Sequence, residues 1–325
     1  MKKITIGILV IFGLMLMLRS DVIKKSKSEV SFVKYGKFKT ERTEIINPQR
    51  KRTDSTDNFK GRGLLNKLAA KIFFKNGEFT KIIDLKKSEI STINHKKKRV
   101  SVKAIKKIVR DEDGSDSDEG EASGEEEGSS DVNITKNKLT VSMTGNKKMV
   151  NDFPSKEYLI LWEVEWESNV DETKGASKLV STVWTTPVTK TISIAQKAES
   201  VFFRSYMKQL GLDTEMKRDE MLGGAWLRIF SSLSKSSSRQ NSENAVKFNK
   251  EISKIKGYPV IIDGEYYTST TGGKKKKGLR GLLKKKKKKN TEEKPKFTFY
   301  TEVLELKLKK FEASDYSYPE GYKIK

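Results

Sequence analysis

The sequence predicts an α+β protein built on one large, twisted antiparallel sheet, with a block of helices on one side of that sheet. Two observations carry this prediction. The stretch EYLILWEVEWE, residues 157–167, alternates with a period of two, which is the pattern of a strand. Strand patterns also occupy both ends of the chain around one helical block, and this order is typical of an antiparallel sheet with helices on one side.

The strand at 157–167 places its largest apolar side chains on one face and its acidic side chains on the other. At about 3.3 Å per residue it would span roughly 35 Å, which is longer than most strands. Such a strand needs a large, twisted sheet around it. The apolar face needs a cover, either helices or a ligand. That face carries Tyr158, Ile160, Trp162, Val164 and Trp166.

The first third of the chain is predicted to form consecutive strands. Apolar and β-branched residues alternate with charged residues around Gly36, and short Lys-rich turns separate the later strands. A meander of this kind is local antiparallel sheet. Strands are predicted at 30–33, 38–46, 49–54, 79–85, 89–94 and 99–102, with a short amphipathic helix after Gly63.

The stretch 111–131 is predicted to be a disordered insertion. It contains eleven acidic residues and no basic residue, with Gly and Ser between them. A segment of this composition cannot bury enough apolar surface to offset the entropy lost on ordering. Beyond it, strands are predicted at 138–144, 157–167 and 178–186.

A helical block follows Pro187. Apolar residues recur at helical spacing from Ile194 to Tyr206, which predicts a helix over 192–210 that stops at Gly211. The remaining predicted elements are helices at 213–230 and 241–255 and strands at 257–271 and 297–311, with a Lys-rich insertion at 272–295 between the two strands.

Residues 1–20 are predicted to be a signal sequence. Lys2 and Lys3 precede an apolar stretch that is shorter than the roughly 20 residues of a membrane span. Arg19 and Ser20 depart from the small residues that a signal peptidase prefers, so an uncleaved anchor in the inner membrane is the alternative. We expect an exported protein in which residues 21–325 form a single domain, located in the periplasm or at the outer membrane.

The composition excludes several kinds of chemistry. The chain has 325 residues, a formal net charge of +24, no cysteine and one histidine. Disulfides and thiol catalysis are therefore impossible, and Ser-His-Asp and zinc sites lose most of their support. His95 stands alone in a basic turn, so a structural role is preferred to a catalytic one. We predict no enzyme activity, no metal site and no cofactor.

The acidic face of the strand at 157–167 allows two interpretations. Carboxylates two residues apart on a strand lie roughly 7 Å from each other, too far to hold one ion without a second strand. A solvated face is therefore preferred to a calcium site. The residues concerned are Glu163, Glu165 and Glu167.

Several short blocks resemble an uncharacterised family of exported bacterial proteins. The blocks are IIDLKKSEISTINHKKKRVSV, TGNKKMVNDFPSKEYLILWEV, KGYPVIIDGEYY and FEASDYSYPEGYKI, in this order, and the resemblance extends over most of residues 29–325. That family is similar to the lipoprotein-localisation carriers LolA and LolB. The resemblance implies a curved half-barrel whose concave face is closed by helices and holds acyl chains. The chain differs from a lipoprotein in lacking cysteine, and from a simple carrier in its long charged insertions.

The apolar stripe is the first candidate binding surface. Its side chains are predicted to be either packed core or the lining of a ligand cavity. The resemblance adds that such a cavity would hold an apolar or acyl-chain ligand. The candidate residues are Tyr158, Ile160, Trp162, Val164, Trp166 and Trp184.

The Lys-rich run is the second candidate surface. Eleven basic residues and no acidic residue lie between Lys274 and Lys289, so the run would attract an anionic membrane surface. No aromatic residue interrupts it, so base stacking is absent and nucleic acid is the least favoured partner. A solvated loop that only joins two strands is the simpler alternative. The candidate contacts are Lys274, Lys275, Lys276, Lys277, Arg280, Lys284, Lys285 and Lys286.

Two hypotheses about function follow from these features. The first is a non-enzymatic exported carrier or scaffold that binds an apolar or lipidic ligand. The second is an electrostatic interaction module whose Lys-rich run docks on anionic lipid, polysaccharide or nucleic acid. A large apolar cavity would favour the first, and a filled core with exposed loops would favour the second. The sequence indicates neither the ligand nor the oligomeric state.

Overall fold

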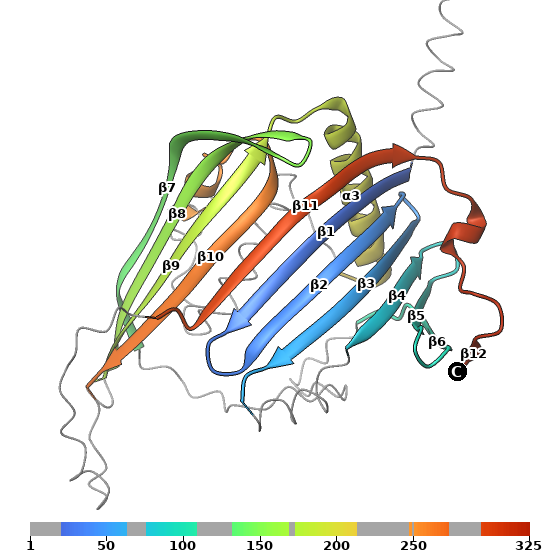
Figure 1. Ribbon diagram of the computed structural model, residues 1–325, viewed down its shortest axis with the longest axis horizontal. Coiled ribbons are helices and arrows are strands. Elements are labelled where there is room, and N and C mark those ends of the chain that lie inside the picture. The colour runs from blue at the N-terminus through green and yellow to red at the C-terminus, as the bar shows by residue number, and fades with distance from the viewer. Residues whose placement is uncertain are drawn as a thin grey trace, which may run out of the picture.

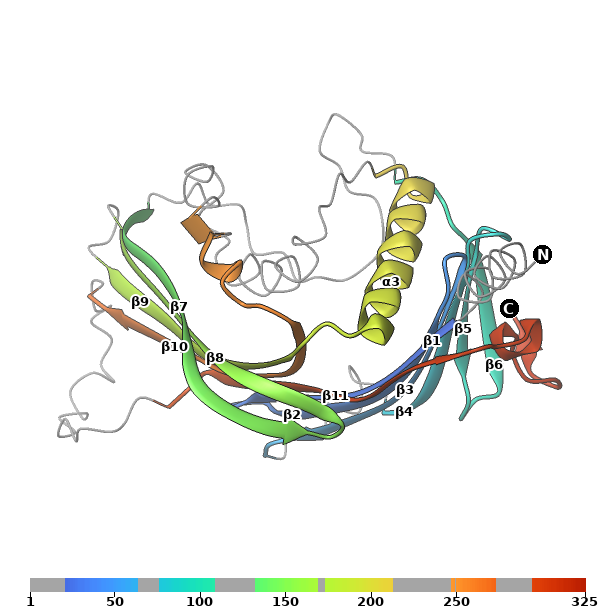
Figure 2. The same cartoon turned by 90° about the horizontal axis from the view of Figure 1, so that it is seen from above.

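The chain forms one large, open sheet of twelve strands that curves strongly, as the computed structural model shows (Figures 1 and 2). The structure describes residues 21–63, 76–108, 132–168, 173–212, 247–248, 250–272 and 294–325. Within these residues there is one long helix. The predicted large, curved antiparallel sheet is therefore confirmed.

Six strands from the first third of the chain form a meander in which each strand pairs antiparallel with the next. Short turns with left-handed residues at Ser88 and Lys98 connect the last three. These strands are β1 (Asp21–Phe32), β2 (Gly36–Ile46), β3 (Arg50–Gly61), β4 (Gly77–Asp84), β5 (Glu89–Asn94) and β6 (Arg99–Ala104).

A second set of strands forms the other half of the sheet. It comprises β7 (Val132–Val150), β8 (Phe153–Ser168), β9 (Lys174–Thr186), β10 (Tyr258–Thr271) and β11 (Phe297–Lys309), and the helix α3 (Lys190–Gln209) follows β9. The two sets join where β11 pairs antiparallel with β1. This long-range pairing places the first described strand at the centre of the sheet, and β7 lies at one edge.

One face of the sheet, here called the concave face, packs against α3, which lies inside the curve (Figure 2). The helix begins at the N-cap Thr189, whose side chain accepts a hydrogen bond from the backbone N–H of Ile192. The buried stripe of α3 includes Ile192 and Ala195, which pack with Val22 of β1 and Leu306 of β11. Amphipathic spacing thus predicted this helix correctly.

The opposite, convex face is crossed by the end of the chain. The 3-10 turn η2 (Ala313–Tyr316) contacts β3, and the short strand β12 (Lys323–Ile324) pairs parallel with β6. The Tyr316 hydroxyl donates to Asp21 Oδ2 at 2.9 Å, and burial raises the pKa of Asp21 above its usual value. The sequence did not predict this strap over the convex face.

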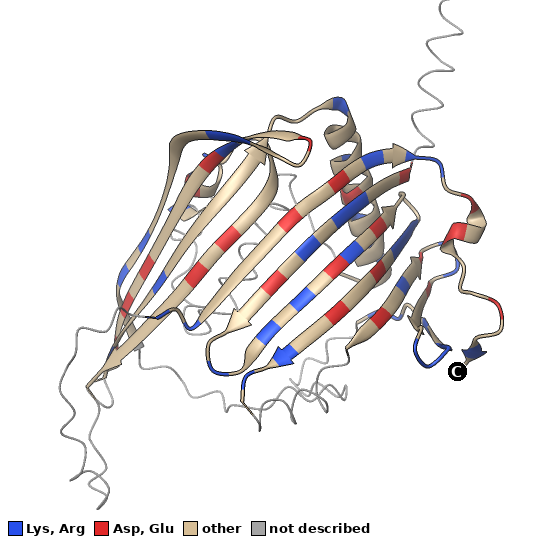
Figure 3. Ribbon diagram, in the orientation of Figure 1, with Lys and Arg blue, Asp and Glu red and all other residues tan. Residues whose placement is uncertain are grey.

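Charged residues recur along the strands of the sheet (Figure 3). On the convex face, cross-strand pairs neutralise many of them, such as Lys25 with Glu305 at 2.8 Å and Lys27 with Glu302 at 2.7 Å. The charged part of the convex face is suited to water.

Several strands are longer than predicted. β1 begins at Asp21 and not at 30, and β3 continues to Gly61, beyond the predicted end of that strand at 54. Both strands are rich in Lys, Ser, Thr and Asp, so their intrinsic strand propensity is weak. They form strands because each one pairs with a neighbouring strand on both sides. Outside the described residues lie the predicted signal sequence, the helices after Gly63 and at 213–230, the acidic insertion and most of the Lys-rich insertion.

Candidate functional site

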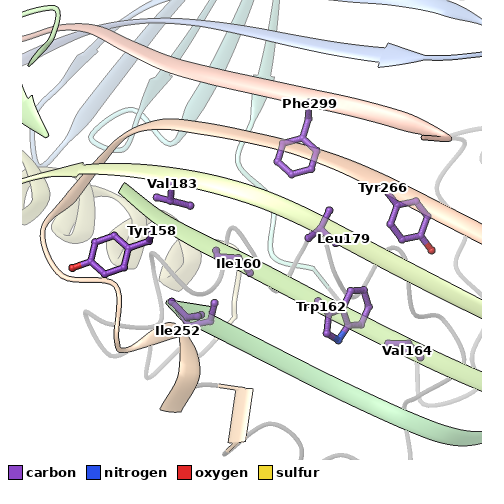
Figure 4. Close-up of a cluster of buried hydrophobic side chains, with 10 residues drawn as sticks. Tyr158, Ile160, Trp162, Val164, Leu179, Val183, Ile252, Tyr266 and Phe299 are labelled. Carbon is purple, nitrogen blue, oxygen red and sulfur yellow. The ribbon is translucent and has the colours of Figure 1, made fainter. Parts of the chain in front are cut away.

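The apolar stripe of β8 lies on the concave face (Figure 4). Tyr158, Ile160, Trp162 and Val164 are buried, and Trp166 is half-buried at the end of the stripe. The alternation that predicted this strand is therefore present in the structure, with the four inward side chains at most 9% exposed.

Neighbouring strands extend the stripe into one continuous cluster. Leu179 lies opposite Trp162, and Val183 lies opposite Tyr158, because β9 pairs antiparallel with β8. We call this group the concave aromatic cluster. Its buried members are Val141, Tyr158, Ile160, Trp162, Val164, Leu179, Val183, Ile252, Tyr266 and Phe299.

Residues 247–255, with 249 not described, cover part of this cluster. The carboxylate of Glu251 accepts a hydrogen bond from the backbone N–H of Val141 at 3.0 Å, which satisfies an amide on the outer side of the edge strand β7. The backbone N–H of Lys256 donates to the Tyr158 hydroxyl at 3.3 Å. Residues 247–256 therefore contact the sheet through hydrogen bonds as well as through an apolar surface formed by Phe248, Ile252 and Ile255.

A cavity of about 190 Å³ opens at the half-buried end of the stripe. The Trp166 indole lies directly over Gly175, so that a Cβ on this glycine would be 2.2 Å from the ring. The cavity also has a charged rim that includes Glu167 and Lys174, which pair at 2.7 Å. An apolar ligand entering here would meet an indole next to a polar rim.

The close contact between Phe299 and Gly264 gives a test of how tightly the cluster is packed. A Cβ on Gly264 would lie 2.3 Å from Cζ of Phe299. We expect Gly264→Ala to lower the free energy of unfolding by about 1–3 kcal/mol, because the ring must move within a filled core. Chemical denaturation measures this loss. In a Phe299→Ala background the same substitution should have almost no effect, and an equal loss in both backgrounds would contradict this explanation.

A second feature of the concave face is a buried ion cluster beneath α3. Lys24 Nζ of β1 lies 2.8 Å from Glu199 Oε1 of α3 and 3.3 Å from Glu44 Oε2 of β2. Glu44 also pairs with Lys51 of β3. The side chains of Lys24, Glu44 and Glu199 are only 19%, 13% and 23% exposed. The cluster therefore ties the helix to three strands.

The ion cluster shifts the pKa values of Lys24 and Glu44. Burial alone would lower the pKa of Lys24, but the carboxylates of Glu199 and Glu44 raise it well above its usual value. Burial alone would raise the pKa of Glu44, but Lys24 and Lys51 lower it to about 2. Burial also raises the pKa of the adjacent Tyr258 to about 12. Lys24 and Glu44 thus both remain charged around neutral pH.

Trp184 does not belong to the concave aromatic cluster. The strand register pairs it with Glu157, and Val183 with Tyr158, so the Trp184 indole lies on the convex face. Lys148 Nζ lies 4.0 Å from the centre of its ring. The sequence analysis grouped Trp184 with the β8 stripe because composition alone does not show which face a strand residue takes.

His95 has a hydrogen-bonded position on the β4–β6 side of the sheet. Its Nε2 lies 2.8 Å from Thr80 Oγ1, and its Nδ1 lies 3.2 Å from the hydroxyl of Tyr322. Thr80 in turn donates to the carboxylate of Asp54. Thr80 is only 1% exposed, so these hydrogen bonds join Tyr322 to the interior of the sheet.

The acidic residues of β8 pair with lysines of the neighbouring strands. Lys136 lies 3.3 Å from Glu163 and 3.0 Å from Glu165. Among the described residues, no three His, Asp or Glu side chains come together in a way that could hold a metal ion. The basic candidates from Lys274 to Lys286 fall outside these residues.

Comparison with known proteins found no matching family model, curated protein or solved structure. In the part of the chain that the structure describes, no helix has both the length and the apolar character needed to cross a membrane.

The sequence analysis missed the residues that strand pairing brings to the concave aromatic cluster from distant parts of the sequence. Tyr266 and Phe299 join the cluster from β10 and β11, far from β8 in the chain. Their own strands alternate in the sequence, which identifies an inward face but not its neighbours. The Lys24, Glu44 and Glu199 contacts have no local sequence signal, because the three residues meet only in the folded sheet.

Proposed function

We propose that this protein is a non-enzymatic exported carrier or scaffold that binds an apolar or acyl-chain ligand on the concave face of a half-barrel like that of LolA and LolB. The observation that supports the proposal best is the concave aromatic cluster, which extends across five strands of the sheet. These side chains are buried beneath residues 247–255, and they would form a surface for an acyl chain once this cover moves away. The N-terminal sequence pattern supports export to the periplasm or the outer membrane.

The connection between the cover, residues 247–255, and β10 suggests how a ligand would enter. The segment 247–255 joins β10 at Gly257, whose φ of +101° only glycine adopts easily. Movement at this point would separate Ile252 from the cluster without breaking a strand pair. The ion cluster would meanwhile hold α3 to the sheet, so the opening would lie on the side of Trp162 and Trp166.

Ligand binding should change the fluorescence of these two tryptophans and raise the melting temperature. The protein is first delipidated, and a fatty acid or lipopeptide is then added. A ligand at a hundred times its Kd adds about 2.7 kcal/mol to the free energy of unfolding. Mass spectrometry of lipids that co-purify with the protein identifies the natural ligand class.

Trp184 provides an internal control in this experiment, because it lies on the convex face. A Trp184→Phe variant should keep the fluorescence response, and a Trp162→Phe/Trp166→Phe variant should lose most of it. If several acyl ligands change neither fluorescence nor melting temperature, the carrier proposal is wrong and the cluster is only packed core.

A second candidate function is the electrostatic interaction module. Its support is the run from Lys274 to Lys289 in a chain of net charge +24. Retention of the protein on heparin or on anionic vesicles that falls steeply with salt, and is lost when the run is replaced, would favour this function over the carrier.

A further inference from the structure

The edge strand β7 carries eight consecutive exposed residues, 142–149, next to the turn into β8. Met143 is 61% exposed and Met149 is 66% exposed. The register places Met143 opposite Tyr158 and Met149 opposite Pro154, so both methionines lie on the same side of the hairpin. We call residues 142–149, together with Lys156, the Met–Lys tip.

The Met–Lys tip has a defined shape. The ladder shifts between Met143 and Lys147, where β7 has extra residues relative to β8. The carboxylate of Glu157 accepts hydrogen bonds from Thr144 Oγ1 at 2.7 Å and from Asn146 Nδ2 at 2.6 Å. Gly145, between them, has a φ of +88° and open space on its Cβ side. The bulge therefore projects outward and is held by its own side chains.

The charge of the tip is basic. Lys147 and Lys156 lie opposite each other on β7 and β8, and within the described residues neither forms a salt bridge. Lys148 follows directly and lies over the Trp184 ring. Of the two nearby acids, Glu157 is engaged inside the bulge, which leaves Asp152 at the turn.

From this combination we propose that the Met–Lys tip docks on an anionic lipid surface, independently of any ligand in the concave face. Unbranched methionine side chains adapt to a fluid acyl region, and lysine ammonium groups attract anionic headgroups. A protein that adds a strand to β7 would need an uninterrupted ladder, and the bulge removes it at this place. The chemistry of the tip therefore favours a lipid headgroup layer over an extended peptide.

Vesicle flotation tests this proposal. Residues 21–325 contain every described element and are used once cooperative unfolding has confirmed their fold. Lys274 to Lys289 are replaced by a Gly/Ser linker of equal length, which removes the competing basic run. The protein is mixed with vesicles of phosphatidylglycerol and phosphatidylcholine, or of phosphatidylcholine alone. We expect flotation with the anionic vesicles, weaker binding at high salt, and little flotation with the neutral ones.

A matched pair of variants locates the contact. Lys147→Gln/Met149→Ser should weaken partitioning onto anionic vesicles by about tenfold, because one cation and one apolar side chain are removed. Lys106→Gln/Ile108→Ser removes one exposed lysine and a 51% exposed isoleucine elsewhere, and should change partitioning less than about twofold. Unchanged melting temperatures show that both variants fold.

Three results would overturn the proposal. The first is that the protein without the basic run fails to float with anionic vesicles. The second is that it floats equally with neutral vesicles. The third is that the two variants bind anionic vesicles equally well. The first result would assign any membrane binding to the Lys-rich run. A soluble protein captured by the tip in place of vesicles would instead make it a protein-docking surface.

Discussion

Replacing Trp162 with alanine should lower the free energy of unfolding by about 3–5 kcal/mol, because a buried indole at the centre of the concave aromatic cluster leaves a large void. Trp162 is 5% exposed and contacts both the sheet and a polar partner. Its Nε1 donates to Asn137 Oδ1 at 2.9 Å, so truncation also removes a hydrogen bond. Urea denaturation of the delipidated protein measures the loss.

Two variants separate packing from other effects. Trp162→Phe keeps an aromatic ring and removes the indole N–H, so it should cost only about 1 kcal/mol. Leu159→Ala changes the opposite face of the same strand, where the side chain is 38% exposed, and should cost less than about 1 kcal/mol. If Trp162→Ala costs as little as Leu159→Ala, the indole does not pack in the core, and it would instead line an empty site.

Replacing Lys24 with methionine should also lower the free energy of unfolding by about 3–5 kcal/mol. Methionine fills a similar volume, but the substitution leaves the carboxylates of Glu44 and Glu199 without their shared cation in a poorly hydrated place. The double variant Lys24→Met/Glu199→Gln removes one of these charges and should regain part of the loss. Equal losses in the single and double variants would show that the helix does not depend on this ion cluster.

The effect of Lys24→Met should depend on pH in a defined direction. In the native protein the pKa of Glu44 is lowered from 4.5 to about 2, so its ion pairs contribute stability above pH 4.5 that is lost as the pH falls towards 2. Lys24, whose pKa is raised, remains charged throughout this range. The difference between native protein and variant should therefore be largest near neutral pH and should shrink below pH 4.5. A difference that is constant from pH 7 to pH 3 would contradict this assignment.

The local spacing of apolar residues was sufficient to predict a strand or helix that has one apolar face. β5 was predicted with the bounds 89–94 that it has in the structure, and the inward face of β8 was predicted residue by residue. The helix over 192–210 differs from α3 by only two residues at its start and one at its end. In each case the period of the apolar residues reports burial on one side, and burial is what stabilises the element.

The local spacing of apolar residues did not predict the strands that are held by backbone pairing with their neighbours and not by burial of an apolar face. The segment KKSKS in β1 has no apolar residue, yet β2 and β11 satisfy its backbone on both sides. The N-terminal half of the sheet is thereby joined to β11 more than 260 residues later, which no short-range signal could indicate. The C-terminal strap is a similar case, since the Tyr316 hydroxyl meets Asp21 only after the sheet has formed.

The sequence by itself determined that a large antiparallel sheet forms, that one strand carries an apolar stripe, and that thiol chemistry is absent. These follow from composition and from a period of two, which are properties of consecutive residues. The tertiary structure alone decided that Trp184 faces away from Trp162, that Tyr266 and Phe299 complete the cluster, and that Lys24 lies between Glu44 and Glu199. Each of these depends on which strands become neighbours and in which register, and a shift of one residue would reverse every inward and outward side chain.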